Sequence, residues 1–365
     1  MKKICLILFL LFLSFPLCGK AAGEAPPPPE YFHAVVTKAV PVPVKNGTGT
    51  LQRVTIRITD GAEAGTETAF FHNVPVMKEA RSFLVKEGDP VVIAKTFQQG
   101  SAVYRIADFS RLPYLYGLAA FFGIMLFAIG GKRGFKSLVV IALPLAIVFY
   151  GMMPLILSKK ENILLITLAL SVLTASLTQV IISGWNAKTL GAFLGASGGV
   201  AMAALLSYLS ISLMHLSGLE SEEANTLRLL YLPDMNFQDI LFAGLMLSAL
   251  GTVMDTAISV ASSQYEVKAA RPDISCRALF TSGVRIGRDI MGTCSNTLIL
   301  AYLGGFFPLI LLMLSAKDTP FWIMMNSGAI ASELVRSLTG CIGLICTIPI
   351  SSLTTAWCLT RKHRD

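Results

Sequence analysis

The sequence contains few charged residues, few histidines and no regular spacing of cysteines. Asp, Glu, Lys and Arg make up only 14% of its 365 residues, against about 25% in an average soluble domain. It has 4 histidines and 7 cysteines, and no cysteine lies between residues 19 and 275. A disulfide framework or a zinc motif needs cysteines and histidines at short, repeated intervals. The sequence therefore excludes a disulfide-stapled domain and a zinc module, and we expect no metal and no cofactor.

Hydrophobic residues, in contrast, are abundant. They make up 54% of the chain, and the mean hydropathy of +0.65 is a value that soluble globular proteins rarely reach. The formal net charge of +8 comes from basic residues in short loops between apolar runs, with no basic tract outside them. This distribution is typical of membrane topology and not of a polyanion partner. The sequence predicts an integral protein of the lipid bilayer that does not bind nucleic acid.

The first 30 residues are typical of a targeting segment followed by a spacer. Residues 1–22 combine a basic start with an apolar run, which favours a secretory signal peptide. Two alternatives stay open, an uncleaved N-terminal anchor and lipidation at Cys18. All three place the following segment outside the cytoplasm. Residues 23–30 include the sequence EAPPPPE, which predicts a short, stiff polyproline-like spacer.

Residues 31–111 alternate between apolar and polar side chains with a period of two. Five such runs are separated by Asn-Gly, Asp-Gly, Gly-Asp-Pro and Gly-Ser turn sequences. We expect strands at residues 31–40, 51–60, 66–74, 90–97 and 102–109. Five short strands in about 80 residues indicate a small extracytoplasmic all-β domain, a barrel or a sandwich.

Residues 112–359 contain apolar runs that are each long enough to cross a hydrocarbon core of about 30 Å. Basic residues follow the first run and predict that its far end is cytoplasmic. By alternation, residues 218–237 are outside, while residues 263–289 and the basic tail 360–365 are inside. The seven predicted spans are Leu112–Gly130, Ser137–Leu157, Asn162–Ile182, Thr189–Met214, Asp239–Ala261, Ile290–Ser315 and Leu338–Cys358.

Residues 321–337 are apolar but short, and they carry Asn326, Glu333 and Arg336. An eighth crossing here would put the basic tail outside, against the positive-inside rule. We therefore expect this segment to dip into the membrane and return, or to lie on its outer surface. The predicted fold class is an α-helical polytopic membrane protein with about seven transmembrane helices, this re-entrant segment and the N-terminal all-β domain.

Polar side chains interrupt the fifth and sixth spans at helical spacing. A charge at mid-membrane costs at least about 2.5–3.5 kcal/mol, so such groups face a protein interior or a water-filled cavity. The structural alternative is an i,i+4 pair of Arg285 and Asp289 that anchors the inner end of the sixth span. We expect the two spans to pack together, with Glu333 and Arg336 closing the outer end of a shared polar cavity. The polar residues are Ser248, Thr252, Asp255, Ser259, Ser262 and Glu266 on the fifth span, and Arg285, Asp289, Thr293 and Asn296 on the sixth.

Glycines recur every four residues in the fourth span. Gly191, Gly195 and Gly199 would let a neighbouring helix approach closely, so we interpret them as a packing face. The same stretch also matches a serine-nucleophile pattern around Ser197. His215 is the only histidine in the spans, and it lies about 27 Å further along the helix, too far to act as its base.

Three blocks of the sequence resemble one protein family. They are residues 251–263 (GTVMDTAISVASS), 287–305 (GRDIMGTCSNTLILAYLGG) and 326–344 (NSGAIASELVRSLTGCIGL). These blocks are similar to the YibE/F-like family of bacterial multi-pass membrane proteins, and the similarity extends to the β segments VTIRITDGAEAGTETAF and VKEGDPVVI. The resemblance implies a multi-pass fold but no settled biochemical activity. It implies that the polar positions of the family are Asp255, Ser259, Ser262, Ser263, Arg288, Asp289, Asn296, Glu333 and Arg336.

The leading functional hypothesis is a permease or channel for a small solute or ion, with proton coupling through Asp255, Asp289 and Glu333 as an option. The alternative is a non-transporting scaffold or sensor whose outer β domain binds an envelope protein. An enzyme would need a nucleophile beside a base, which the sequence does not offer. A homo-oligomer is compatible with both hypotheses. Both place the protein in the bacterial cytoplasmic membrane, with the β domain outside and the C-terminus in the cytoplasm.

Overall fold

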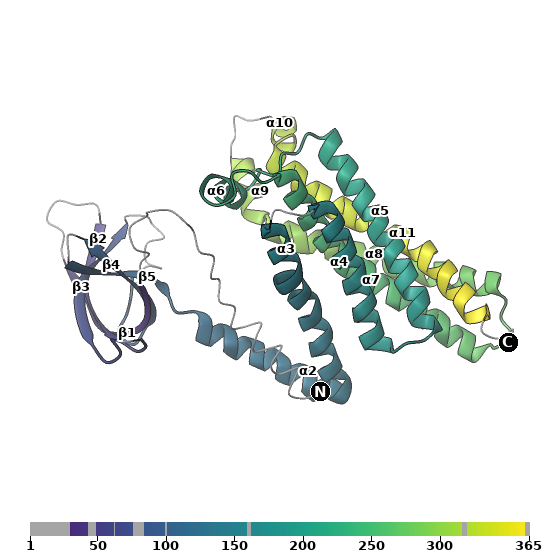
Figure 1. Cartoon of the computed structure of the whole chain (residues 1–365), viewed down its shortest axis with the longest axis horizontal. Coiled ribbons are helices and arrows are strands. Elements are labelled where there is room, and N and C mark those ends of the chain that lie inside the picture. The colour runs from purple at the N-terminus through teal and green to yellow at the C-terminus, as the bar shows by residue number, and fades with distance from the viewer. Residues whose placement is uncertain are drawn as a thin grey trace. The chain divides into compact units, whose positions relative to one another are not determined.

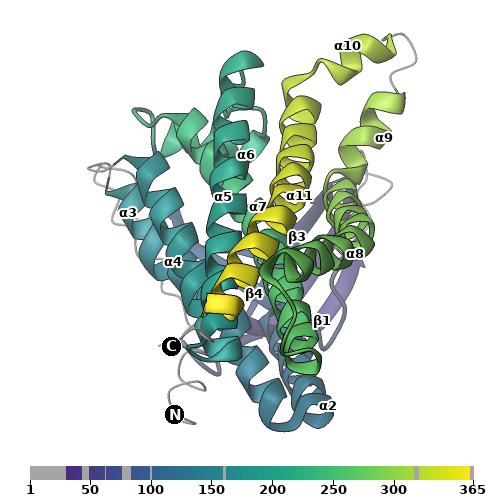
Figure 2. The same cartoon turned by 90° about the vertical axis from the view of Figure 1, so that its right-hand side faces the viewer.

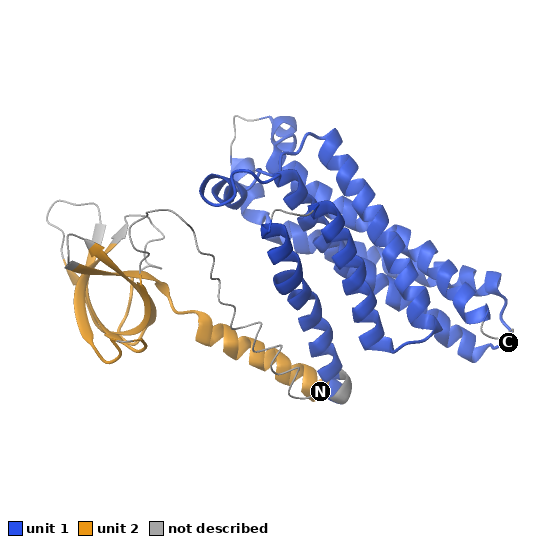
Figure 3. Cartoon of the chain, in the orientation of Figure 1, with its two compact units in different colours: residues 1–15, 130–365 blue, residues 16–129 orange. Residues whose placement is uncertain are grey.

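A computed structural model describes residues 30–42, 49–61, 63–75, 84–98, 101–158, 162–315 and 320–361. The chain forms two compact units, residues 16–129 and residues 1–15 with 130–365 (Figure 3). The predicted signal peptide, the proline-rich spacer before Glu30 and the last four residues of the basic tail lie outside the described residues.

The first unit contains a five-stranded antiparallel sheet (Figure 1). Its strands pair in the order β3-β2-β1-β4-β5, so β1 is the central strand. The five strands and the all-β prediction are confirmed, because apolar side chains alternate along each run and fill one side of the sheet. The strands are β1 Glu30–Val42, β2 Gly49–Ile58, β3 Glu67–Pro75, β4 Pro90–Gln98 and β5 Ser101–Phe109.

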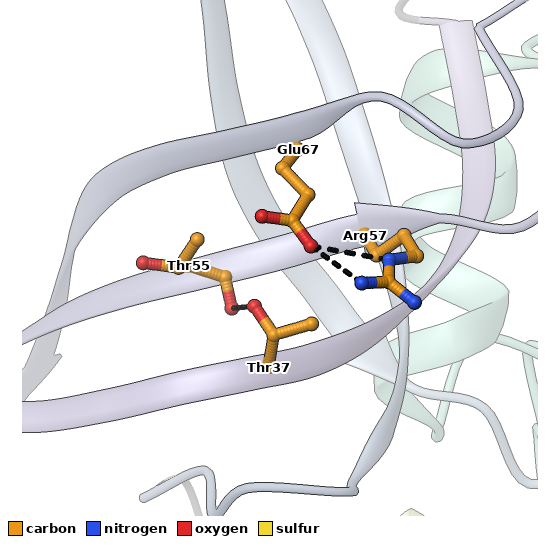
Figure 4. A network of polar contacts seen from close by, with 4 residues as sticks. All are labelled: Thr37, Thr55, Arg57 and Glu67. Carbon is orange, nitrogen blue, oxygen red and sulfur yellow. Dashed lines mark hydrogen bonds and ion pairs between the residues drawn. The ribbon is translucent and has the colours of Figure 1, made fainter.

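Alternate residues of the sheet form a buried cluster on one face. Polar side chains also make contacts between neighbouring strands (Figure 4). Arg57 Nη2 on β2 lies 2.8 Å from Glu67 Oε1 on β3, and the Thr37 hydroxyl donates to the Thr55 carbonyl. Because Arg57 and Glu67 are exposed, their ion pair stabilises the sheet only slightly. The buried cluster comprises Ala34, Val36, Val54, Ile56, Ile58, Val85, Val91 and Ile93.

The rest of the described chain is helical. The element α2 is interrupted at Gly131, whose φ of 54° and ψ of −127° are not helical. The helices are α2 Leu112–Ala146, the π-helix η2 Ile147–Met152, α3 Met153–Leu157, α4 Ile163–Ser183, α5 Ala187–Leu213, α6 Glu222–Leu230, α7 Phe237–Ala270, α8 Cys276–Gly305, α9 Phe307–Ser315, α10 Phe321–Met325 and α11 Gly328–Arg361.

Six helices of the described chain are long and apolar enough to cross a membrane. The count rises to seven if α8 and α9, which are bent by 61° at their junction, form one broken span. The six are 112–131, 134–157, α4, α5, α7 and α11. The predicted set of apolar helices is therefore present, while its sixth member is a bent pair.

Two predicted boundaries differ from the structure. Residues 263–289, expected as a loop, form the end of α7 and the first half of α8, and only residues 271–275 connect the helices. Residues 328–337, expected in a re-entrant or surface segment, are the first turns of the continuous helix α11. In both places a serine caps the new helix: Ser275 accepts from the Ala278 amide, and Ser327 accepts from the Ile330 amide.

The helix α11 is the centre of the helical unit. It packs against α5, α7 and α8, and it lies between α5 and α8 (Figure 2). The bundle has two ends, which we name by their connections: the α6 end, where α5 stops and α7 begins, and the 271–275 end, where α7 stops and α8 begins. A buried apolar cluster from α4, α5, α7 and α11 fills the interior.

Candidate functional site

Small residues bring α5 against α11. A Cβ on Gly195 would overlap the backbone and side chain of Ser351, and a Cβ on Gly191 would meet Thr355 in the same way. The close approach allows hydrogen bonds between the helices, since the Thr354 hydroxyl donates to the Gly191 carbonyl at 2.7 Å. The third member of the predicted packing face, Gly199, lies against Thr347 of α11. One side of α11 is thereby occupied by α5.

A second seam of small residues brings α8 against α11. A Cβ on Gly287 would overlap Ile348, and a Cβ on Gly283 would meet Gln264 and Ser352. Further along, Leu298 contacts the Cβ position of Gly340. These contacts run in opposite directions along the two chains, so α8 and α11 are antiparallel. They also determine which side of α8 is used for packing and which side is left uncovered.

Gln264 joins three helices near the 271–275 end. Its side chain is fully buried, and its Nε2 donates to the Leu279 carbonyl of α8 at 2.8 Å and to the Ser352 carbonyl of α11 at 3.1 Å. Within the described chain its Oε1 has no hydrogen-bond partner. Gln264 was not among the residues predicted from the sequence. The sequence feature that could have identified it is an amide side chain inside an apolar run, because buried amide groups are usually hydrogen-bonded.

A polar cluster lies between α7, α8 and α11 towards the α6 end. The Tyr302 hydroxyl of α8 donates to the Ser248 carbonyl of α7 at 2.9 Å. Arg336 and Glu333, both on α11 and partly buried, form an ion pair of 3.0 Å. Arg336 Nη2 approaches within 3.9 Å of the Cβ position of Gly244 on α7. Glu333 and Arg336 are therefore partly covered by the neighbouring helices and not fully exposed. Their neighbour Tyr302 was not predicted from the sequence.

The predicted residues of α7 and α8 lie on uncovered faces. Asp255 and Ser259 are exposed on α7, and Arg288, Asp289 and Asn296 are exposed on α8, while Ser262 is half-buried. Among the described residues, Asp255, Arg288 and Asp289 form no hydrogen bond or ion pair by side chain. The i,i+4 pair of Arg285 and Asp289 is likewise not formed there. The uncovered polar faces, rather than a closed cavity, are what the structure presents.

Two contacts relate heights on α7 to heights on α8. Ser248 of α7 is level with Tyr302 of α8, and Gln264 of α7 is level with Leu279 of α8. Asp255 lies between Ser248 and Gln264, so in an antiparallel pair it is level with the middle of α8. Arg288, Asp289 and Asn296 project from that part of α8. We call the set Asp255, Ser259, Ser262, Arg288, Asp289 and Asn296 the α7–α8 polar face.

The α7–α8 polar face does not include Glu333 and Arg336. Ser248, beside the Tyr302 cluster, is seven residues from Asp255, which is about 10 Å along a helix. The cavity of about 300 Å³ near the α6 end has other residues in its lining, among them His215, Gln238 and Asp239. Asp255, Asp289 and Glu333 thus form two separate groups in the structure.

An open depression of about 450 Å³ lies at the start of α8. Arg277, Thr281, Ser282 and Arg285 line it. Thr281 and Arg285 lie on the same side of α8 as Arg288, because residues three and four apart share a helix face. A hydrophilic surface therefore extends from the 271–275 end to the middle of α8.

Comparison with known proteins identifies the family. No curated protein and no solved structure matches the chain. The model of the YibE/F-like protein family matches residues 118–361, about two thirds of the chain, which include α4, α5, α7, α8 and α11. The residues of the α7–α8 polar face and of the Glu333–Arg336 pair all lie within the match. The chain therefore belongs to the YibE/F-like family.

Proposed function

We propose that the chain is a permease or channel of the bacterial cytoplasmic membrane that passes a small ion or polar solute along the α7–α8 polar face. The observation that carries the proposal is the uncovered position of Asp255, Arg288 and Asp289 at one height of two long helices. A charged group facing hydrocarbon costs at least about 2.5–3.5 kcal/mol. Three such groups on one face would be tolerated only where water or protein covers them.

The chemistry of this face suits a small hydrophilic solute. Carboxylates of Asp255 and Asp289 bind cations, the Arg288 guanidinium binds an anionic group, and Asn296 offers both a donor and an acceptor. The hydroxyls of Ser259 and Ser262 extend the same face towards the 271–275 end. Asp255 has no cation beside it on its own helix, so proton uptake and release at this carboxylate is the coupling that we propose.

The test is a flux measurement on the purified chain in liposomes. Proton flux is followed with an entrapped pH dye, and Na⁺, K⁺ and Cl⁻ fluxes with ion-selective dyes. Losing a hydrogen bond or ion contact to a charged group costs about 1.5–3 kcal/mol, so Asp255→Asn should reduce the flux at least about tenfold.

A matched control is available on the same helix. Asp239 also lies on α7, but it lines the separate cavity with His215. Asp239→Asn should retain the flux of the unaltered chain. Equal flux through Asp255→Asn and the unaltered chain, or no flux of any probe above protein-free liposomes, would contradict the proposal.

A further inference from the structure

The α7–α8 polar face has no counterpart in its own chain. The helix α8 buries only Leu279, Gly283, Gly287 and Leu298 of its 30 residues. By comparison, α7 buries 14 of 34 residues and α11 buries 17 of 34. Of these three helices, the one with the most charge in its middle is therefore the one with the least cover. A helix that carries Arg285, Arg288 and Asp289 within a membrane needs a covering surface for these charges.

Two glycines on the uncovered faces support close approach of another helix. A Cβ added to Gly251 of α7 or to Gly292 of α8 would have nothing within 4 Å. The glycines of α8 that pack on α11, Gly283 and Gly287, are in tight contact. Glycine in a helix interior lowers helix propensity, and small residues are typical of helix–helix interfaces in membranes. Gly251 and Gly292 flank Asp255 and Arg288 by one turn each.

We propose that a second copy of this chain covers the α7–α8 polar face, so that the path lies between two copies. This inference rests on the proposed function and specifies how its path is completed. The charges favour a second copy because the face carries both signs, Asp255 on α7 and Arg288 on α8, at one height. A two-fold axis along the helices joins identical heights. Asp255 of each copy then opposes Arg288 of the other, which makes the face complementary to itself.

The arrangement also explains why the charges are unpaired within one chain. Asp255 and Arg288 make no ion pair among the described residues of a single copy, although they are level with each other. Two reciprocal pairs form across the axis, and the open positions of Gly251 and Gly292 let the backbones approach. The remaining polar groups, Asp289 and Asn296, line the space between the copies.

The test measures how many copies associate. A concentration series of the full-length chain is prepared in detergent, and each sample is then transferred to lipid nanodiscs at a large excess of discs. Mass photometry counts the copies per disc. We expect two copies for the unaltered chain. Asp255→Arg and Arg288→Asp each reverse one charge that the proposed dimer buries. Each should raise the dimer dissociation constant at least about 100-fold. The combined variant should return to within about tenfold of the unaltered chain.

Controls separate loss of dimer from loss of fold. Asp273→Arg reverses a charge in the exposed 271–275 connection and should leave the dimer unchanged. Cross-linking gives a second readout, in a background whose other cysteines are serine. A bismaleimide should join two copies through Gly292→Cys but not through Leu173→Cys, which is exposed on α4.

The outcomes for dimer and function are independent. One copy per disc at every concentration, or a dimer that neither charge reversal weakens, would overturn the second-copy inference even if liposomes show flux. A dimer that charge reversal weakens, but that passes none of the four probe ions, would support the second-copy inference and contradict the permease proposal.

Discussion

At the residue scale, His215 has a backbone conformation that is unusual for its side chain. Its φ is 52°, the only positive φ of a described residue other than glycine. The Leu216 amide donates to the Ile211 carbonyl at 3.1 Å, and the His215 amide donates to the Ser212 carbonyl at 3.4 Å. These two bonds define a Schellman motif that ends α5, in which glycine is the usual residue. His215 therefore carries backbone strain beside the cavity near the α6 end.

We predict that His215→Gly is more stable than His215→Ala by about 1 kcal/mol, because only glycine relieves the left-handed conformation. Both variants remove the imidazole, so their difference isolates the backbone. The measurement is the thermal unfolding midpoint in detergent. Equal midpoints would show that the end of α5 rearranges when the side chain is lost.

Glu63 connects two strands of the β domain through a polar triad. Its carboxylate accepts hydrogen bonds from the Lys95 ammonium group and from the Tyr104 hydroxyl, the latter at 3.0 Å. The Lys95 hydrogen bond, followed by that of Tyr104, lowers the pKa of Glu63 below its ordinary value of 4.5. Burial, followed by the hydrogen bond to Glu63, raises the pKa of Tyr104. The ionised form of Glu63 is thus the one that stabilises the folded sheet.

The lowered pKa makes this stabilisation depend on pH in a defined direction. It is fully present above pH 4.5 and is lost as the pH falls through the lower, folded-state pKa. Glu63→Gln should therefore melt earlier than the unaltered chain at pH 7, and the two melting temperatures should converge at acid pH. Loss of the amide I band of the sheet reports the transition. Glu67→Gln, in the exposed pair with Arg57, should change it little at either pH. A difference for Glu63→Gln that grows at acid pH would contradict this assignment.

At the element scale, the seam between α5 and α11 depends on the absence of side chains. Gly195 has the Cα and Cβ of Ser351 where its own Cβ would be. Ser351 cannot retreat easily, since its hydroxyl donates to the Ala257 carbonyl of α7 at 3.1 Å. Three helices therefore share this contact.

We predict that Gly195→Ala destabilises the helical unit by about 1–3 kcal/mol through overpacking. Gly123→Ala is the matched control, because Gly123 of α2 has nothing within 4 Å of its Cβ position. There alanine should be neutral or stabilise by up to about 1 kcal/mol through helix propensity. Urea-induced unfolding in detergent measures both variants. Equal effects of the two substitutions would mean that α5 and α11 are not in close contact.

At the scale of the whole helical unit, the two ends of the bundle should lie on opposite sides of the membrane. The connection that contains α6 and the 271–275 connection are separated by the full length of α7. The end of α11 lies with residues 271–275, because Leu359 packs with Leu279 and Ile274. The positive-inside rule predicts that this basic end is cytoplasmic.

We predict that a membrane-impermeant maleimide labels Thr226→Cys in intact cells and labels Asp273→Cys only after permeabilisation. Both positions lie in exposed segments, which makes their reactivity comparable. The background for both is the chain with its native cysteines replaced by serine. Labelling of Asp273→Cys in intact cells would reverse the proposed orientation.

The sequence alone determined the strands and most of the long helices of this protein. Alternation with a period of two located all five strands, since side chains of a strand point to opposite faces by covalent geometry. Apolar runs located the long helices for an equally local reason. Where the prediction was wrong, at residues 263–289 and 328–337, polar side chains had been assigned to loops. The capping residues Ser275 and Ser327 carried the correct helix starts.

Only the tertiary structure decided what covers each helix face. Helical spacing shows that Asp255 and Ser259 share a side of α7. It cannot show that this side is open while Gln264, nine residues beyond Asp255, is fully buried against α8 and α11. In the same way, Tyr302 acquires its partner Ser248 only because the antiparallel packing of α8 on α7 brings residues 54 positions apart together. Local spacing is determined by the backbone, whereas burial depends on contacts between segments distant in sequence.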